Sequence, residues 1–310
     1  MTPPYRMIDQ IDMSLEMETV PGHQLLLQIG EGRYGEIWLT RHDSGQYRAL
    51  KIIRRDRFQS EKPFEREFYG IRKYEPVSRQ HKELIDILEV GRDDERNFFY
   101  YTMELADDRD LGQQIVPDKY RAKTLLSELR ARGSLRTREC LELGISMALA
   151  LACLHRAGLV HRDIKPANIV YLDGTPRMAD IGSVKLLDDS ISIAGTEGYM
   201  PVEGPGRPTG DIFSLGKVLY EMVTGEECKQ YPALLDSHSE RQKPEFQGLR
   251  KVILKACEHM PEDRYQDADS LARDLEKLAN PGANRMHPLA ILGALILLAA
   301  LIYGLYAVLA

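Results

Sequence analysis

The chain has 310 residues, of which 43% are hydrophobic and 28% charged, an ordinary balance for a globular protein with one large or two medium domains. Its net charge is −6 and no basic run occurs along it, which argues against nucleic acid as a partner. The four cysteines, Cys140, Cys153, Cys228 and Cys257, form no C-x-x-C pair. We therefore expect single buried thiols in a reducing compartment, not disulfides or a metal site.

The chain begins with an N-terminal arm, residues 1–22, that carries several acidic residues and no apolar run. This composition does not fit a signal peptide, and it predicts no function for the arm.

Residues 24–38 predict a strand, a glycine-bearing turn and a second strand, with Gly30, Gly32 and Gly35 in the turn and Ile37 just after it. Glycines let a hairpin's backbone approach phosphates, with amide N–H groups facing the oxygens. A dinucleotide-binding unit would open a helix at the third glycine, and no helical pattern begins there. A hairpin without a phosphate role remains the alternative.

Residues 47–53 predict a strand that contains Lys51, which stands 16 residues after the last glycine of the turn. A lysine in an apolar strand usually lies at an edge or on the surface, and that is the alternative to a binding role. Residues 63–74 predict a helix that offers Lys51 an acidic partner. Glu67 is favoured because an apolar residue follows it one turn later on the same face, and Glu65 is the rival.

Residues 97–103 predict a strand of large apolar side chains, and residues 104–106 predict a hinge between two lobes. A polar stretch follows, with a helical pattern near residues 123–132. Residues 137–157 then predict a long helix, from apolar residues near helical spacing.

Directly after this helix, residues 161–168 combine Asp163, Lys165 and Asn168 in the pattern Asp-x-Lys-x-x-Asn. Transfer of a phosphoryl group to a hydroxyl needs a carboxylate to accept the hydroxyl proton, a cation to meet the phosphate charge and a neutral oxygen to hold a metal ion. The pattern therefore favours phosphoryl transfer over the alternative, a polar loop.

A second carboxylate, Asp180, stands 17 residues after Asp163. Residues 168–172 and 177–179 predict a small hairpin joined by a tight turn at Asp173, and Asp180 follows it. A carboxylate there is placed to hold Mg²⁺ on nucleotide phosphates, although such a turn is also common without a ligand.

The C-terminal stretch, residues 289–310, has 22 residues without a charge. As a helix it is about 33 Å long, enough to cross a bilayer core of about 30 Å, and a buried core helix is the alternative. Arg285 and His287 precede it, so the positive-inside tendency places residues 1–288 in the cytoplasm. We expect a single-pass protein of the cell membrane with no sensor domain beyond the span.

Taken in order, these motifs resemble those of eukaryotic-like Ser/Thr protein kinases, and the sequence Gly-Thr-Glu-Gly-Tyr-Met at 195–200 looks like that of bacterial members with a membrane anchor. The resemblance covers about residues 24–280. It implies an α+β, two-lobed protein kinase fold with ATP between the lobes. The expected parts are a kinase domain at 23–280 with a β-rich N-lobe (23–103) and a helical C-lobe (107–280), a linker (281–288) and a transmembrane helix (289–310).

The resemblance also implies roles for single residues. Asp163 becomes the catalytic base and Lys165 a γ-phosphate contact, while Asn168 and Asp180 become metal ligands. Lys51 and Glu67 become an activating ion pair. The nucleotide site is assigned to Gly30, Gly32, Gly35, Ile37, Ala49, Lys51, Glu67, Met103, Glu104 and Ala106.

Structural and regulatory roles follow in the same way. Asp211 would anchor the catalytic loop, and Glu203 would form a buried pair with Arg264. Arg162 implies regulation by a phosphate on the activation segment, for which Ser183, Ser190 and Ser192 are the candidate sites. Thr196 is interpreted as a fixed hydroxyl of the substrate pocket rather than a phosphorylation site.

Two positions depart from the family pattern. Ile181 stands where a phenylalanine is usual, which would change the balance of active and inactive states. Pro201-Val202 replaces Ala-Pro before Glu203, which is expected to leave folding intact and to alter substrate docking.

The expected function is a membrane-anchored kinase that uses ATP and Mg²⁺, or Mn²⁺, to phosphorylate protein serine and threonine. A homodimer that phosphorylates its own activation segment is a possible partner arrangement. The alternative from another class is a pseudokinase that binds nucleotide and acts as a membrane scaffold. A small-molecule kinase is less favoured, because residues 196–203 resemble a peptide-binding segment.

Overall fold

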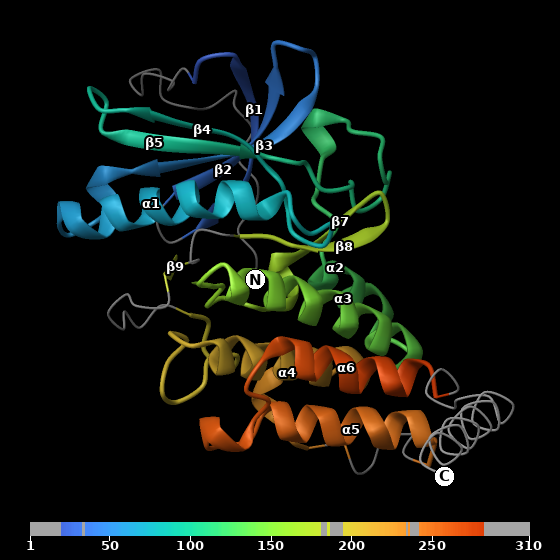
Figure 1. Ribbon diagram of the computed structural model, residues 1–310. Coiled ribbons are helices and arrows are strands. Elements are labelled where there is room, and N and C mark those ends of the chain that lie inside the picture. The colour runs from blue at the N-terminus through green and yellow to red at the C-terminus, as the bar shows by residue number, and fades with distance from the viewer. Residues whose placement is uncertain are drawn as a thin grey trace, which may run out of the picture.

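The computed structural model describes residues 20–32, 35–180, 185–186, 195–233, 235 and 242–281. It has two lobes, an upper one made of a sheet with one long helix beside it and a lower one made of a group of helices (Figure 1). The predicted two-lobed α+β fold is therefore confirmed. Most of the N-terminal arm, Ile181, the three candidate serines and residues 289–310 lie outside the described residues.

The N-lobe is an antiparallel sheet with the strand order β1-β2-β3-β5-β4. Its strands are β1 (His23–Gly32), β2 (Gly35–His42), β3 (Tyr47–Arg54), β4 (Ile87–Asp93) and β5 (Phe98–Met103). Aromatic residues and a threonine make up most of β5, and every residue of β5 is buried.

Each face of this sheet covers its own apolar cluster. Helix α1 (Glu61–Ser78) lies on one face, where Phe64 packs against Phe99 with ring centroids 5.2 Å apart. The opposite face carries a smaller cluster, which we call the second core: Val20, Leu50, Ile52, Phe98 and Tyr100. Successive strand residues point to opposite faces, so β3 and β5 supply both clusters.

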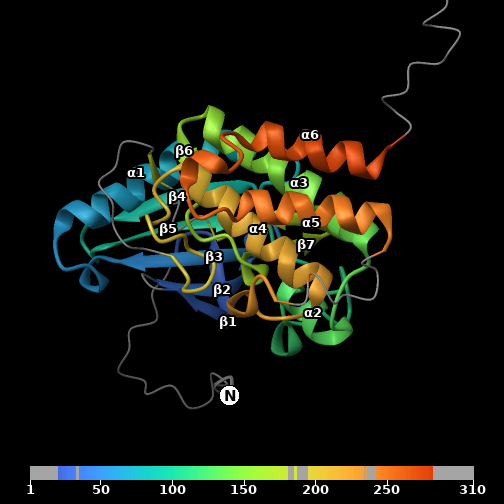
Figure 2. The ribbon, with the colours of Figure 1, turned by 90° about the horizontal axis from the view of Figure 1, so that it is seen from below.

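The C-lobe is built around helix α3 (Thr137–Arg156), which is buried on most sides. Helices α4 (Pro208–Thr224) and α6 (Ala268–Ala279) pack against it, and α5 (Pro244–Ala256) packs on α4 (Figure 2). The short helix α2 (Leu125–Arg132) begins at a capping box formed by Thr124. The apolar core of the C-lobe continues without a break into the α1 side of the N-lobe.

Short strands and turns lie where the lobes meet. Strand β6 (Leu159–Val160) pairs with β9 (Lys185–Leu186), and β7 (Ile169–Leu172) forms a hairpin with β8 (Thr175–Met178). The second strand of that hairpin begins two residues before the predicted residue 177, because the turn is only two residues long and Leu172 pairs directly with Thr175. Single 3-10 turns lie at Arg55–Arg57, Pro117–Lys119, Pro166–Asn168, Cys228–Gln230 and Pro261–Asp263.

Other sequence-based expectations can be compared with the described residues. The helix predicted at 63–74 is longer, and the one predicted at 137–157 ends one residue earlier. All four cysteines are free and buried, as predicted. Within the residues that the structure describes, no helix is both long and apolar enough to cross a membrane, and the predicted span lies outside them.

The start of β2 depends on the missing side chain of Gly35. A Cβ on Gly35 would lie 1.8 Å from the carbonyl oxygen of Ile52, a backbone atom of β3. Gly35→Ala should therefore lower the free energy of unfolding by about 2–3 kcal/mol, since two strands must separate to accept the methyl group. Urea denaturation followed by the fluorescence of Trp38, the only tryptophan of the chain and part of β2, measures the change.

Gly206→Ala is the matched control, because nothing lies within 4 Å of the Cβ that it adds. Its effect should stay within about 0.5 kcal/mol. Equal effects of the two substitutions would contradict this account of the β2–β3 contact.

Candidate active site

A cavity of about 570 Å³ opens between the lobes. The strands of the glycine hairpin, β3 and the hinge form its upper wall, and the loop around Asp163 forms its lower wall. Ile29, Ile37, Ala49 and Val170 give it apolar surfaces, which suit a flat ring. The hairpin lies directly over the lysine, because a Cβ on Gly32 would be 3.5 Å from Lys51 Nζ.

Most residues of the predicted nucleotide site line this cavity. Those brought together are Gly30, Gly32, Ile37, Ala49, Lys51, Met103, Glu104 and Ala106, with Asp163, Lys165, Asn168, Asp180 and Thr196 on the other side. Leu105 of the predicted hinge also lines it, and sequence reasoning missed Ile29, Tyr120 and Thr124, which line it as well. Ile29 could have been found, since it lies next to Gly30 in an apolar strand.

The two lobes are joined across the cavity by an ion pair. Lys51 Nζ of β3 donates to Asp180 Oδ1 at 2.7 Å. Burial by itself would lower the pKa of Lys51, but the charge of Asp180 and the hydrogen bond to it raise the pKa above its ordinary value. Burial would likewise raise the pKa of Asp180, yet Lys51 and then Lys165 bring it down to about 2. Both groups are therefore charged at neutral pH.

The expected partner of Lys51 needs correction. Glu67 is buried on the inner side of α1, whereas Glu65 binds Arg92 outside with N–O distances of 2.9 and 2.6 Å, so Glu67 is the inward residue of the two. Among the described residues, however, Lys51 forms its ion pair with Asp180 and not with Glu67. Glu67 acts on Lys51 at longer range and helps to raise its pKa. The Lys51 ammonium therefore binds the carboxylate of Asp180, a residue that the sequence analysis had assigned to a metal ion.

The lower wall holds a connected group of polar side chains centred on Asp163. Lys165 Nζ donates to Asp163 Oδ2 at 2.7 Å, and Thr196 Oγ1 donates to Oδ1 at 2.6 Å. Lys165 also donates to Thr196 Oγ1 at 2.9 Å. Asn168 Nδ2 donates to the Asp163 main-chain oxygen at 2.8 Å and to Oδ2 at 3.0 Å. The hydroxyl of Thr196 is thus held in the position of a fixed pocket group.

Asp211 supports this loop from beneath and is fully buried. Its carboxylate accepts the main-chain N–H groups of His161 and Arg162, both at 2.8 Å, and lies 2.9 Å from His155 Nε2. Arg162 has a left-handed φ of 74°, which costs free energy for a residue with a side chain. The two N–H bonds to one carboxylate hold the backbone in that conformation. The contribution of His155 was missed by the sequence analysis.

His161 connects the loop to the part of the cavity wall that carries Asp180. Its Nε2 donates to the carbonyl oxygen of Ala179 at 3.0 Å, since a carbonyl can only accept. Asp180, the next residue, also has a left-handed φ, of 55°. The positions of Asp163 and Asp180 therefore depend on one buried network.

The donor atoms near Asp180 fit a hard cation. Asn168 and Asp180 both line the cavity, and an amide oxygen with a carboxylate is the kind of donor set that Mg²⁺ and Mn²⁺ bind. Asn168 uses its N–H groups on Asp163, so its carbonyl oxygen is the atom that it can offer to a cation.

The predicted pair of Glu203 and Arg264 is present. Arg264 Nη1 and Nη2 lie 2.5 and 3.2 Å from the two carboxylate oxygens of Glu203. The guanidinium also donates to the carbonyl oxygens of Thr209, Glu258 and His259. One departure from the family pattern, Val202, lies beside this pair and is 83% exposed.

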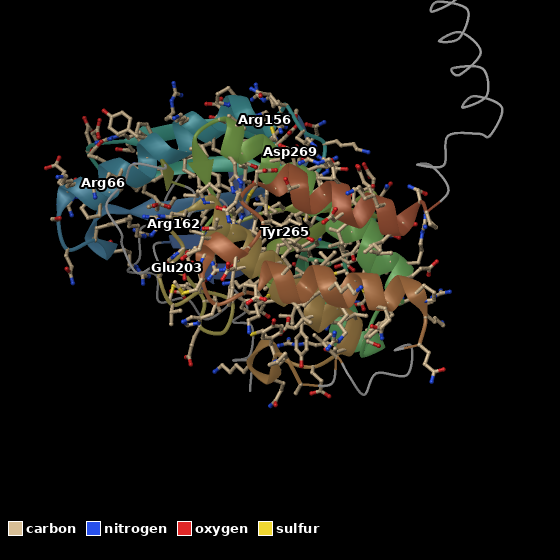
Figure 3. All side chains as sticks on the ribbon, turned by 60° about the horizontal axis from the view of Figure 1, so that its bottom comes forward. Arg66, Arg156, Arg162, Glu203, Tyr265 and Asp269 are labelled. Carbon is tan, nitrogen blue, oxygen red and sulfur yellow. The ribbon has the colours of Figure 1, made fainter. Side chains whose placement is uncertain are left out.

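Two further contacts join separate elements of the C-lobe. Tyr199 donates to Glu221 at 2.6 Å, and Glu221 accepts the N–H of Cys228 at 2.7 Å, which ties the segment around Tyr199 to α4. Arg156 and Asp269 lie side by side at the ends of α3 and α6, with distances of 2.8 and 3.0 Å (Figure 3). Neither contact was predicted, because each joins residues that are far apart in the sequence.

The two-lobed fold and the cleft between the lobes define a protein kinase. The profile of the protein kinase domain matches residues 23–281, and the chain belongs to this family. It is 29% identical over 283 residues to a probable serine/threonine-protein kinase of Clostridium perfringens (83% of this chain, 38% of the relative). It is 26% identical over 276 residues to the serine/threonine-protein kinase PrkC of Bacillus subtilis (82% and 40%).

A third relative, the probable serine/threonine-protein kinase PknB of Corynebacterium glutamicum, is 27% identical over 287 residues (83% of this chain, 42% of the relative). The chain thus spans about two-fifths of the length of these relatives. The predicted family, eukaryotic-like Ser/Thr kinases, is confirmed.

Loss of Arg264 should be costly, because it leaves the Glu203 carboxylate and three carbonyl oxygens without their donor. Arg264→Ala is expected to lower the free energy of unfolding by about 3–5 kcal/mol, as for other buried pairs that lose one member. Denaturation by guanidinium chloride, followed by far-ultraviolet circular dichroism, measures it.

Arg273→Ala provides the control, since Arg273 is 60% exposed and lies 3.9 Å from Asp267. An exposed pair contributes about 0–1 kcal/mol. A loss at Arg264 no larger than the loss at Arg273 would show that the Glu203 pair does not stabilise the C-lobe.

Proposed function

We propose that this chain is a Ser/Thr protein kinase that transfers the γ-phosphate of ATP to protein hydroxyls with the help of Mg²⁺. The observation that carries the proposal is the convergence of Asp163, Lys165 and Thr196 within hydrogen-bond distance, in one cleft with Asn168 and Asp180. The names of the relatives, all called serine/threonine-protein kinases, support the choice of substrate hydroxyl.

Asp163 is suited to act as the base. A carboxylate has about four lone-pair positions, and within the described residues Asp163 uses three of them, for Lys165, Thr196 and Asn168. The remaining position can accept the proton of a substrate hydroxyl. As the hydroxyl oxygen bonds to the γ-phosphorus, the bond from that phosphorus to its bridging oxygen breaks, its electron pair leaves with ADP, and the proton passes to Asp163.

The cations of the site would meet the phosphate charge. Lys165 lies beside Asp163, where the transferred group must pass, and Lys51 lies under the glycine hairpin. Bound Mg²⁺, held by Asp180 and Asn168, would neutralise charge on the phosphates. Lys51 stays protonated at all working pH values because its pKa is raised, so it can move from Asp180 to a phosphate without losing charge.

Replacement of Asp163 by Asn separates this proposal from the pseudokinase scaffold. The variant keeps the shape of the side chain and removes the base, so transfer of labelled γ-phosphate to a general acceptor protein should fall by about 10²–10⁴. The measurement uses the full chain with Mg²⁺ and labelled ATP, and nucleotide binding is measured in parallel.

Asp173→Asn makes the same change at an exposed turn and should leave transfer unaltered. Equal activity of wild type and Asp163→Asn would refute the role of Asp163. If the wild type binds ATP but transfers no label, the scaffold function would replace the kinase.

We also propose that residues 289–310 anchor the kinase in the cell membrane with its catalytic domain in the cytoplasm. Support comes from the 22 uncharged residues of that stretch. Activation by a second copy of the chain, through phosphorylation of Ser183, Ser190 or Ser192, belongs to the same proposal and rests on the presence of Arg162. Two predictions from the family pattern stand beside it: Pro201-Val202 alters substrate docking, and Ile181 alters the balance of active and inactive states.

An anchor there would keep the active site close to the bilayer. Helix α6 ends at Ala279, and the roughly ten residues before residue 289 reach at most about 35 Å when extended. We therefore expect the full chain in vesicles to phosphorylate a membrane-tethered acceptor faster than the same acceptor free in solution. Removal of residues 281–310 should abolish the difference. Equal preference in the full and shortened chains would count against the anchor.

A further inference from the structure

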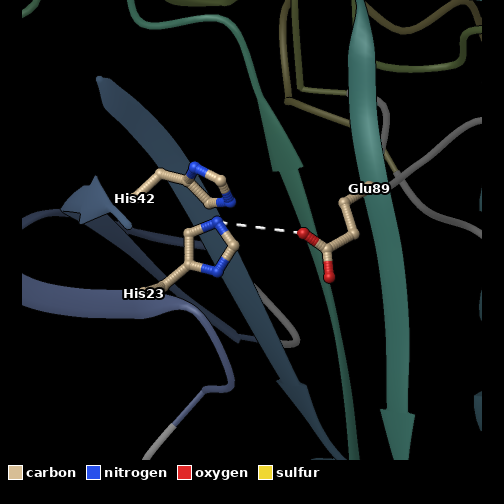
Figure 4. Close-up of side chains that lie close together, drawn as sticks. All are labelled: His23, His42 and Glu89. Atoms are coloured by element: carbon tan, nitrogen blue, oxygen red, sulfur yellow. Dashed lines mark ion pairs between the residues drawn. The ribbon is translucent and has the colours of Figure 1, made fainter. Parts of the chain in front are cut away.

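Three possible metal ligands meet on the N-lobe sheet, away from the cleft. His23 is the first residue of β1, His42 is the last residue of β2, and Glu89 lies in β4. Their ligand atoms lie within 4.8 Å of one another, and His23 Nε2 is 3.9 Å from Glu89 Oε2 (Figure 4). We call these three residues the His–His–Glu cluster. None of them lines the cavity between the lobes.

The hydrogen bonds of His23 fix which ring nitrogen carries a proton. Nδ1 lies 2.9 Å from the carbonyl oxygen of Pro21, and a carbonyl only accepts, so Nδ1 is the donor. In the neutral ring Nε2 then has a lone pair and no proton. His23 is 8% exposed, and among the described residues Nε2 has no hydrogen-bond partner.

This lone pair is directed at the lone pairs of a carboxylate, which is unfavourable unless a cation or a proton lies between them. A proton would require a short hydrogen bond, but 3.9 Å is too long for one. Two ligands on one tetrahedral Zn²⁺ ion, with bonds of about 2.0–2.2 Å, are about 3.3–3.5 Å apart. His23 Nε2 and Glu89 Oε2 would have to approach by about half an ångström to hold such an ion, and the widest pair of the three ligand atoms by at most about 1.4 Å.

Each residue of the cluster is also oriented by a further hydrogen bond, as metal ligands commonly are. His23 donates from Nδ1 to Pro21, and Tyr100 donates to Glu89 Oε1 at 3.0 Å, which leaves Oε2 facing His23. His42 Nδ1 lies 2.8 Å from Ser44 Oγ. Nδ1 also accepts the main-chain N–H of Ser44 at 3.1 Å, so in the neutral ring the proton is on Nε2. A metal ion bound at Nε2 would displace that proton, and Nδ1 would then carry one and donate it to the Ser44 hydroxyl.

We propose that the His–His–Glu cluster is a binding site for a divalent transition metal ion, in first place Zn²⁺. Two imidazoles and a carboxylate suit Zn²⁺ better than Mg²⁺, which prefers oxygen atoms alone. His42 and Glu89 are partly exposed, so the ion can enter from solvent, and a water molecule would complete its coordination. The site is separate from the Mg²⁺ site proposed in the cleft.

The ion would join the two edges of the sheet. β1 and β4 are the outermost strands in the order β1-β2-β3-β5-β4, yet His23 and Glu89 meet, because the sheet curls around the second core. Tyr100 belongs to the second core and donates a hydrogen bond to Glu89 of the cluster. Bound metal should therefore stabilise the N-lobe by mass action, since the unfolded chain does not hold the three ligands together.

The test uses the full, tag-free chain, freed of metal with a chelator and then titrated with Zn²⁺ against a chromophoric competitor in excess Mg²⁺. We expect one tight site, together with a rise in the urea midpoint reported by Trp38. His42→Gln and Glu89→Gln should each weaken that site by at least about 100-fold, and Tyr100→Phe, which removes only an orienting hydroxyl, by about 10–100-fold. Co²⁺ in place of Zn²⁺ should give the absorption bands of a tetrahedral ion.

His81→Gln is the control, because His81 Nδ1 also lies 2.9 Å from a carboxylate, that of Glu83, but belongs to no such three-residue cluster among the described residues. It should bind Zn²⁺ like the wild type. Absence of a tight site in the wild type, or equal affinity in the wild type and in both ligand variants, would overturn the proposal. Urea midpoints without metal show that each variant folds, so loss of binding can be separated from loss of structure.

Discussion

The carboxylate of Asp211 is the group on which the rest of the catalytic apparatus depends. It is fully buried and accepts two successive main-chain N–H groups, those of His161 and Arg162. A buried carboxylate is costly unless it accepts hydrogen bonds, and the left-handed backbone at Arg162 is costly unless hydrogen bonds hold it. The bonds between Asp211 and this backbone offset both costs. Asp163 is the next residue, and its position is therefore set from inside α4 rather than by the exposed loop. The same loop carries His161, whose hydrogen bond to the carbonyl oxygen of Ala179 also fixes the backbone next to Asp180.

The approach of the two lobes depends on a second interaction. Lys51 and Asp180 attract each other across the cavity, and each keeps the other charged despite burial. Burial of charge is costly unless it is paired, so this pair favours an arrangement in which β3 lies close to the lower wall. Glu67 contributes negative charge from α1 without forming the ion pair, among the described residues, that the family resemblance implied. An anionic ligand between the lobes would compete with Asp180 for the lysine, and that exchange couples ligand binding to lobe position.

The sequence was informative where chemistry is local and uninformative where it depends on distant segments. Asp163, Lys165 and Asn168 lie within six residues, so their spacing alone predicted a common site, and the hydrogen bonds around Asp163 agree with it. The strands and helices could be predicted because apolar periodicity reflects which face is buried. The partner of Lys51 could not, because two carboxylates lie within reach of one ammonium and only their positions in space decide between them. Contacts such as Arg156 with Asp269, 113 residues apart, leave no pattern in the sequence.

The same reasoning explains why the His–His–Glu cluster has no sequence signature. His23 and His42 are register partners in a hairpin, so their proximity follows from β1–β2 pairing, but Glu89 comes from the strand at the opposite edge. It reaches them only because the sheet curls over Leu50 and Tyr100. The glycine hairpin lies at the other end of β1 and β2 from the two histidines. A metal ion that joins one end of this hairpin to β4 would restrict the rotation of both strands. Gly30 and Gly32, which line the cavity at the other end, would then move relative to a fixed point.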